Sequence, residues 1–227
     1  RVDIVALVIP SISPEKRREI LNELSSLQVK IRVVAGLAEL MANSVKASDV
    51  KPMSIYDVLG RVPVPPIPDL ISKPVKGKVV MVTGAGGSIG SEICRQIIRN
   101  EPQTLIMFDI SEYSLYQINQ ELEGCLKTRK GKIDLIPIIG SVQNQSLIKA
   151  ILETYQVDTL YHAAAYKHVP LVEQNVSEGV MNNVFGTRSV VAAAIDTGVS
   201  VVTLISTDKA VRSTNIMGAS KRMAEFV

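Results

Sequence analysis

The stretch VVMVTGAGGSIG, residues 79–90, decides the fold of this chain. Its first four residues form an apolar run typical of a parallel strand that is buried on both faces. Gly84, Gly87 and Gly90 follow at three-residue spacing, and a helical pattern runs from residue 91 to residue 100. The glycines permit a tight turn and a close approach to a pyrophosphate, and the start of the helix supplies N–H donors. A lone glycine triplet also fits an ordinary turn, but this order of strand, glycines and helix predicts a dinucleotide site.

An acidic residue ends the next predicted strand. Residues 104–108 form that strand, and Asp109 follows Gly90 by about 20 residues. A carboxylate at this position binds the adenosine ribose hydroxyls and repels a 2′-phosphate. Asp109 could instead cap a helix or a turn, and we favour ribose binding because of the spacing. The sequence therefore predicts NAD as the cofactor, with NADP as the alternative.

Strands and helices alternate from residue 76 onward. The predicted strands are residues 79–82, 104–108, 135–139, 159–162 and 201–205. The predicted helices are residues 91–100, 114–126, 147–155 and 176–197, and a further helix opens at residue 217. Such alternation favours a parallel sheet with helices on both faces. We therefore expect an α/β, doubly wound Rossmann domain over residues 76–227, truncated at its C-terminal end.

Residues 1–62 are interpreted as a separate small α/β domain. Apolar runs at residues 3–9 and 31–35 predict two strands, and Ser13-Pro14 begins a helix between them. A short helix is expected at residues 54–60. This part has no glycine-rich loop for phosphate, which favours a packing or assembly role. Five prolines then predict an extended linker over residues 63–75.

The composition argues against several classes of function. Lys and Arg total 25 against 22 acidic residues, and no basic tract is interleaved with aromatics, so nucleic-acid binding is not expected. Cys94 and Cys125 lack metal-ligand spacing, so we expect no metal and a reducing, cytoplasmic environment. No apolar run is long enough to span a membrane. Arg1 leads into a strand without an initiator Met and Val227 stops inside a predicted helix, so we expect a fragment of a longer protein.

Small and polar residues follow the fourth predicted strand. Ala163–Ala165 would leave room for a cofactor over the sheet, and Lys167 lies just outside the strand ends, where ligands bind. His162 and His168 more often indicate core or loop histidines than catalysts.

The fifth predicted strand is followed by a group of chemically active side chains. Residues 206–209 read Ser-Thr-Asp-Lys, and residues 217–221 read Met-Gly-Ala-Ser-Lys. Acid, amine and hydroxyl groups beside a nicotinamide would form a proton-transfer set. From the residues alone, Asp208 and Lys209 fit a solvated turn equally well.

Several motifs in order carry a family resemblance. They are TGAGGSIG (83–90), FDISEYSLYQ (108–117), HAAAYKHVP (162–170), NNVFGT (182–187) and STDKAVRSTNIMGASKR (206–222). The sequence strongly resembles the bacterial polysaccharide-biosynthesis nucleotide-sugar 4,6-dehydratases. These are extended short-chain dehydrogenases, and their usual substrate is UDP-N-acetylglucosamine. The resemblance is close over residues 53–227, and the first 50 residues are similar to the cytoplasmic domain of long, membrane-anchored members.

This resemblance implies roles for individual residues. The cofactor would be bound by Gly84, Gly87, Ser88, Ile89, Gly90, Asp109, Ser141, Val142, Ala163, Ala164, Ala165 and Lys221. The catalytic residues would be Thr207, Asp208, Lys209, Met217 and Lys221, and the substrate would contact Lys167 and Asn183. Met217 replaces the Tyr of Y-x-x-x-K, as in the long members. Ser141 stands where relatives commonly have Asp, which weakens the case for adenine recognition there.

The resemblance also implies a reaction. Hydride would pass from sugar C4 to the nicotinamide, the C5 proton and C6 hydroxyl would be lost, and the hydride would return at C6. Lys209 would act at C5 and Asp208 would protonate the leaving hydroxyl, so we expect a lowered lysine pKa and a raised acid pKa. Deprotonation at O4 falls to Thr207, a bound water or Asp208, and the sequence leaves these alternatives open.

Two other functions compete with the dehydratase. A UDP-sugar 4-epimerase needs the same cofactor without elimination, and a dinucleotide-binding and assembly module needs no chemistry. For the whole protein we expect a UDP-sugar substrate, a homo-oligomer and a position on the cytoplasmic face of the inner membrane, anchored only by a missing N-terminal segment. The 227 residues alone are expected to be inactive, because most sugar and uridine contacts would lie in a missing C-terminal part.

Overall fold

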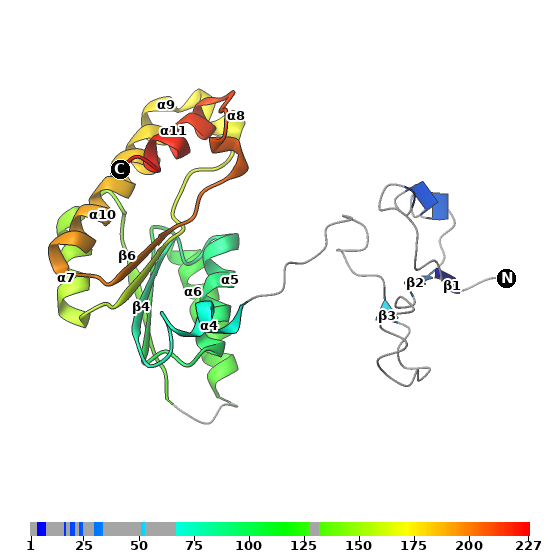
Figure 1. Ribbon diagram of the computed structural model, residues 1–227, viewed down its shortest axis with the longest axis horizontal. Coiled ribbons are helices and arrows are strands. Elements are labelled where there is room, and N and C mark those ends of the chain that lie inside the picture. Colours follow the sequence, from blue (N-terminus) through cyan, green and yellow to red (C-terminus); the bar gives the residue numbers. More distant parts are fainter. Residues whose placement is uncertain are drawn as a thin grey trace. The chain divides into compact units, whose positions relative to one another are not determined.

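The computed structural model describes residues 67–127 and 132–227 (Figure 1). Before residue 67 it describes only residues 4–7, 16, 19, 20, 23, 24, 30–33, 51 and 52. Contacts divide the chain into two compact units, Arg1–Pro66 and Ile67–Val227.

The first unit has a three-stranded sheet among its described residues. Strand β1 (Ile4–Leu7) pairs in parallel with β2 (Lys30–Val33), as expected when a helix connects two strands. The short strand β3 (Lys51–Pro52) is antiparallel to β2, and no apolar pattern in the sequence predicts it. The helix predicted at residues 54–60 lies outside the described residues.

The second unit begins inside the predicted linker. Helix α4 (Pro68–Ser72) occupies the middle of that segment, and the Val75 side chain is buried in the core of this unit. The expectation of an extended linker is therefore wrong from Pro68 onward. Pro68 is the first residue of α4, where its missing N–H would have no helical partner, so a proline is tolerated there.

Five parallel strands form the sheet of the second unit (Figure 1). They are β4 (Val79–Thr83), β5 (Thr104–Asp109), β6 (Asp134–Ile139), β7 (Thr159–His162) and β8 (Val201–Leu204). Their spatial order is β6-β5-β4-β7-β8, so the chain builds outward from β4 in one direction and then returns to its other side. The C-terminal ends of β4 and β7 therefore form the topological switch point, where ligands bind in such sheets.

Helices cover both faces of this sheet. On one face lie α5 (Ser88–Arg99) and α6 (Glu112–Leu126), and on the other lie α7 (Gln145–Tyr155) and α10 (Gly186–Thr197). Alternate residues of β4 divide between the two cores, with Val80 and Val82 facing the first pair and Met81 facing the second. This period of two confirms that β4 is buried on both sides.

The remaining helices lie near the C-terminal ends of the strands. They are α8 (Val169–Gln174), α9 (Val176–Val180), a π-helix (Met181–Phe185), a 3₁₀ turn (Asp208–Ala210) and α11 (Ile216–Ala224). The single helix predicted over residues 176–197 is thus helical throughout but contains a π segment in its middle. Within the described ranges, the helices are all too short or too polar to cross a bilayer.

Candidate functional site

The glycine loop connects β4 to α5 and requires glycine at two positions. Gly84 has φ +69°, and a Cβ there would lie 2.6 Å from the Ala164 nitrogen. A Cβ at Gly90 would lie 2.0 Å from the Gly84 carbonyl oxygen. Main chain therefore packs against main chain on both sides of the loop, and no side chain larger than hydrogen fits without a backbone shift.

The loop presents the N-terminus of α5 at the switch point. Gly87 is the residue before the helix and provides no side-chain cap, so the first N–H groups of α5 are left for a ligand. Lys167 Nζ donates a hydrogen bond to Ser88 Oγ at 2.7 Å, which adds a cation to this end of the helix. An anion such as a pyrophosphate would be stabilised here by the lysine and by the helix dipole.

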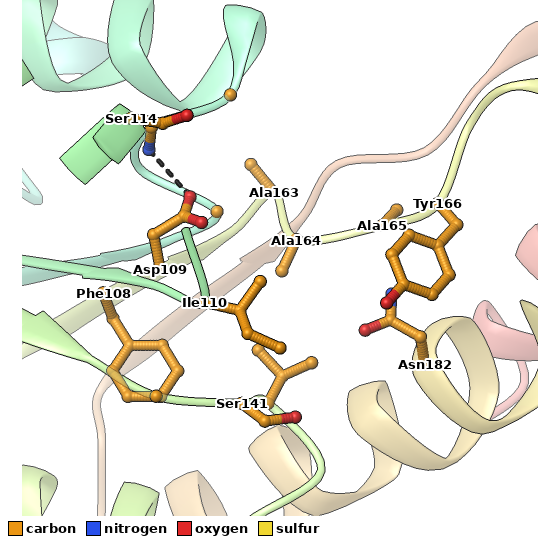
Figure 2. Close-up of a pocket in the computed structure, with 15 residues that line it drawn as sticks. Phe108, Asp109, Ile110, Ser114, Ser141, Ala163, Ala164, Ala165, Tyr166 and Asn182 are labelled. Atoms are coloured by element: carbon orange, nitrogen blue, oxygen red, sulfur yellow. Dashed lines mark hydrogen bonds between the residues drawn. The ribbon is translucent and has the colours of Figure 1, made fainter. Parts of the chain in front are cut away.

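A first cavity, of ≈ 210 Å³, opens on one side of the glycine loop; we call it the Asp109 cavity. Figure 2 shows Asp109 toward one end of it and Tyr166 and Asn182 toward the other. Its lining includes the predicted residues Gly84, Gly87, Asp109, Ser141, Val142 and Ala163–Ala165. Residues that the sequence analysis missed also line it, namely Gly86, Phe108, Ile110, Ser114, Gly140, Tyr166 and Asn182.

Asp109 is buried, and main-chain donors hold its carboxylate. Its Oδ2 accepts a hydrogen bond from the Gly86 nitrogen at 2.8 Å, which is the dashed line in Figure 2, and its Oδ1 accepts one from the Ser111 nitrogen at 2.8 Å. The carboxylate thus fixes the glycine loop as well as lining the cavity. Each oxygen keeps a second lone pair that a ribose hydroxyl could use.

Asn182 is the clearest residue that the sequence analysis missed. It belongs to the π-helix, is 9% exposed, and donates from Nδ2 to Asn183 Oδ1 at 3.1 Å, while the residue itself lines the Asp109 cavity. π-Helical turns are frequent at functional sites, but helical periodicity in the sequence does not reveal them. The one feature of the sequence that could have pointed to Asn182 as a cavity residue is the pair of adjacent asparagines within a long predicted helix.

A second cavity, of ≈ 280 Å³, opens on the other side of the loop; we call it the Lys221 cavity. It is lined by the predicted residues Gly87, Ser88, Ile89, Gly90, Ala163, Ala165, Lys167, Thr207, Lys209, Met217 and Lys221, and by Tyr166, Ile205 and Ser206. The structure therefore brings together most of the side chains that the sequence analysis singled out. They come from α5, from α11 and from the segments that follow β4, β7 and β8, which are far apart in the chain.

Lys221 is held firmly in this cavity. It is 5% exposed, and its Nζ donates to the Ile205 carbonyl oxygen at 2.7 Å. Burial lowers the pKa of this amine, and the Glu225 carboxylate opposes the shift. A fixed amine with a bonded carbonyl is suited to binding a hydroxyl-bearing ligand, with two N–H donors still available.

Asp208 does not meet the expectation for a general acid. It does not line the Lys221 cavity, and its side chain is 90% exposed. Its pKa is lowered rather than raised, because the Thr207 hydroxyl donates to Oδ1 at 3.0 Å and the Lys209 ammonium lies 3.5 Å from the same oxygen. The expectation of a raised pKa is therefore wrong for the chain as described, since exposure and a nearby cation both favour the carboxylate.

Asn183 is not accessible to a substrate. It is fully buried and lines none of the cavities described above, and its side chain bonds to the main-chain N–H and carbonyl of Tyr166 at 2.8 and 3.0 Å. Its Nδ2 also donates to Ser220 Oγ at 3.0 Å. The predicted substrate contact is therefore wrong, and Asn183 instead joins the segment after β7 to α11.

Acid is expected to destabilise the fold through His162. Burial, assisted by the Lys221 charge, lowers the pKa of this ring from 6.5 to about 3. The unfolded chain keeps an ordinary histidine pKa, so below about pH 6.5 it binds a proton that the folded chain excludes. Stability therefore falls as the pH drops, by roughly 2 kcal/mol between about pH 6.5 and pH 5.

Urea unfolding at several pH values in this window measures the effect. His168→Gln is the matched control, because His168 is exposed, and it should keep the pH slope. His162→Gln should remove most of the slope even if its absolute stability is lower. A wild-type stability that stays constant over this window would contradict the buried, neutral assignment.

The arrangement as a whole fits a dinucleotide. The Asp109 and Lys221 cavities share Gly87, Ala163, Ala165 and Tyr166, so they meet at the N-terminus of α5. A Cβ at Gly87 would lie 3.2 Å from the Gly84 carbonyl oxygen, which is a tight contact. Within the described parts of the chain, no cluster of His, Cys, Asp or Glu side chains could hold a metal ion.

The parallel sheet, the glycine loop at its switch point and the paired cavities define a Rossmann-type α/β protein. Residues 80–227 match the family model described as polysaccharide biosynthesis protein, and the chain belongs to that family. It is 40% identical over its whole length to the capsular polysaccharide biosynthesis protein CapD of Staphylococcus aureus, of which it covers 37%. The UDP-glucose 4-epimerase of Rickettsia canadensis is 33% identical over 65% of this chain and 42% of that protein. The chain thus spans less than half the length of these curated relatives.

Solved structures agree with the fold. Pen from Bacillus thuringiensis has a TM-score of 0.60 and 32% identity, over 67% of this chain and 44% of that one. DesIV, a dTDP-glucose 4,6-dehydratase from Streptomyces venezuelae with NAD and TYD bound, has a TM-score of 0.54 and 22% identity, over 65% of this chain and 49% of that one. These similarities confirm the predicted α/β Rossmann class.

Proposed function

We propose that this chain binds NAD across the carboxyl edge of its parallel sheet. The adenosine occupies the Asp109 cavity, the pyrophosphate lies at the N-terminus of α5, and the nicotinamide ribose reaches Lys221. The observation that carries this proposal is the pair of cavities joined at Gly87, with a carboxylate in one and a buried amine in the other. DesIV, which has a similar fold, was solved with NAD.

We further propose that the protein carrying this chain is a nucleotide-sugar 4,6-dehydratase acting on UDP-N-acetylglucosamine. When bound, NAD would supply hydride transfer from sugar C4 and back to C6. Thr207, a bound water or Asp208 takes the O4 proton. Lys209 takes the C5 proton and returns it when hydride adds at C6, and Asp208 protonates the C6 hydroxyl as it leaves as water. Lys221 orients the nicotinamide ribose, and Met217 contributes shape but no proton.

Support for this reaction comes from the position of the amines. Thr207, Lys209, Met217 and Lys221 line one cavity, and the exposed Lys209 side chain is free to reach a bound sugar. A third cavity, of ≈ 460 Å³, shares Ala165, Tyr166 and Lys167 with it and offers space for the rest of a nucleotide sugar. For Asp208 to act as an acid, substrate must cover it and raise its pKa by desolvation.

A UDP-sugar 4-epimerase is the second candidate. It uses the same cofactor site without elimination at C6, and a relative at 33% identity carries that name. A binding and assembly module without catalysis is the third candidate. The proposed homo-oligomer, membrane anchor and cytoplasmic-face location of the whole protein stay predictions.

Product analysis separates these candidates. The whole protein is incubated with UDP-N-acetylglucosamine and NAD, and the sugar nucleotides are analysed by mass spectrometry. A dehydratase yields a 4-keto-6-deoxy product that has lost one water, an epimerase yields an isomer of unchanged mass, and a binding module yields neither. The isomer alone would overturn the dehydratase proposal in favour of the epimerase.

We expect this chain to prefer NAD to NADP by about ten- to hundredfold in affinity. The Asp109 carboxylate would lie close to a 2′-phosphate, and Ile110 rather than an arginine follows it. Repulsion in a partly buried site costs roughly 1–3 kcal/mol. Titration calorimetry with both cofactors measures the ratio, and equal or tighter binding of NADP would contradict the prediction. Asp109→Asn should reduce the preference, whereas Asp134→Asn, at an exposed carboxylate on β6, should leave it unchanged.

A further inference from the structure

The segment Ala163–Ala165 forms a wall between the two cavities, and none of its side chains can form a hydrogen bond that would hold it in place. Ala163 and Ala165 line both cavities, and Ala164 lines the Asp109 cavity (Figure 2). An alanine side chain can neither donate nor accept a hydrogen bond. One main-chain hydrogen bond, from the Ala163 nitrogen to the Thr83 carbonyl oxygen at 3.0 Å, holds the start of this three-alanine wall. Its side-chain support must come from contacts to the residues at its two ends, His162 and Tyr166.

The first end is held by a buried imidazole. His162 is 1% exposed, and its Nδ1 lies 2.6 Å from Thr83 Oγ1, at the end of β4. Its Nε2 lies 3.0 Å from Thr187 Oγ1, on α10. The ring thus connects the C-terminal ends of β4 and β7 to α10.

The second end is held by the same helical segment. Asn183 binds both main-chain groups of Tyr166, and it lies one turn before Thr187. The Thr187 hydroxyl donates to the Asn183 carbonyl oxygen at 2.6 Å. Both anchors of the wall are therefore joined through one hydroxyl group.

The proton positions follow from this geometry. Thr187 has a single hydroxyl proton, and the Asn183 carbonyl can only accept, so that proton points to the carbonyl. Thr187 Oγ1 must then accept from His162 Nε2, which carries the ring proton. Burial keeps the ring neutral, with a pKa of about 3, so Nδ1 is an acceptor for the Thr83 hydroxyl.

We propose that His162 is a positioning residue, locked as the neutral Nε2–H tautomer, whose bridge from Thr83 through Thr187 to Asn183 holds the three-alanine wall. The hydrogen-bond chain itself does not depend on the proposed function. Only its effect on cofactor affinity rests on the proposal that NAD lies against this wall.

The tautomer is tested directly by long-range ¹H–¹⁵N correlation spectroscopy on the ¹⁵N-labelled 227-residue chain. The chain has only two histidines, so His168→Gln leaves the His162 ring as the sole imidazole signal. We expect one protonated nitrogen, Nε2, and one unprotonated nitrogen, Nδ1, unchanged from about pH 8 to about pH 5. A proton on Nδ1, averaging between the tautomers, or a doubly protonated ring in that range would overturn the assignment.

A matched pair of variants tests the positioning role. Thr187→Val removes the hydroxyl at nearly constant volume, while Thr187→Ser retains it. We expect Thr187→Val to allow both His162 tautomers and to weaken NAD binding about tenfold. We expect Thr187→Ser to keep the Nε2–H tautomer and to change the NAD affinity by less than about twofold. If Val leaves the tautomer and the NAD affinity unchanged, the bridge does not hold the wall.

The outcomes separate this inference from the proposed function. If the wild-type chain shows the locked tautomer but binds no NAD, the bridge is supported and the cofactor proposal fails. If it binds NAD but shows another tautomer, the bridge fails and the cofactor proposal is unaffected. The wild-type spectrum needs no substitution in the bridge, so an unfolded Thr187 variant does not remove the test.

Discussion

Lys209→Met in the whole protein is expected to lower kcat by roughly 10²–10⁴, while the affinity for NAD changes less than about tenfold. Lys209 and Lys221 both line the cavity in which we propose that the sugar is oxidised, but they differ in freedom. Lys221 is buried and bonded to the Ile205 carbonyl, whereas the Lys209 side chain is 54% exposed. Lys209 is therefore the amine that can move toward a bound sugar, and Lys221 is the one that holds a ligand.

The controls follow from this division. Lys221→Met should weaken NAD binding strongly, because it removes the amine that would bind the cofactor. Met217→Leu should lower kcat by less than about tenfold, because a thioether carries no titratable proton. Deuterium exchange from solvent at sugar C5, followed separately from product formation, identifies the base. Normal exchange in Lys209→Met would show that another group removes the C5 proton.

Gly90→Ala is expected to lower the free energy of unfolding by roughly 3–5 kcal/mol and to abolish measurable NAD binding. The added Cβ would lie 2.0 Å from the Gly84 carbonyl oxygen and 3.0 Å from the Ala85 Cα. Both contacts are with main chain, so no flexible side chain can move aside. The glycine loop must open, and it carries the residues that separate the two cavities.

Gly124→Ala provides the matched control. Gly124 lies in α6, and a Cβ there would meet no atom within 4 Å. This substitution should raise stability by about 0.5–1 kcal/mol, since alanine loses less backbone entropy in a helix. Chemical denaturation of the two variants and calorimetry with NAD give the comparison. A Gly90→Ala chain with wild-type stability would contradict the packing described for the loop.

Local features of the fold could be predicted because they are encoded locally. The apolar run at residues 79–82, the glycine spacing and the position of Asp109 each follow from rules that act over a few residues. The same holds for the strand and helix sequence of the second unit. The error in the linker arises because proline is compatible with two local structures. Five prolines within residues 63–75 predicted an extended segment, but a proline is also favourable as the first residue of a helix, as at Pro68.

The candidate site could be predicted only in part, because the position of a side chain depends on non-local packing. The family resemblance implied that Asn183 contacts the substrate and that Asp208 is an acid with a raised pKa. The structure buries Asn183 against Tyr166 and leaves Asp208 in solvent beside Lys209. The charged neighbour of Asp208 is adjacent in the sequence, but the burial of Asn183 and the exposure of Asp208 depend on tertiary packing and cannot be inferred from spacing along the chain.

The sequence by itself determined that a strand, a glycine loop and a helix follow one another in an order suited to binding an anion, and that a carboxylate ends the next strand. Only the tertiary structure decided that β7 lies beside β4. Several strand orders are compatible with the same local sequence patterns, so the sequence does not specify which strands pair. That pairing puts His162 beside Thr83 and brings the three-alanine wall against the glycine loop. The two cavities and the buried bridge exist because residues about 80 positions apart meet there, and hydrogen bonds of that kind have no signature in sequence periodicity.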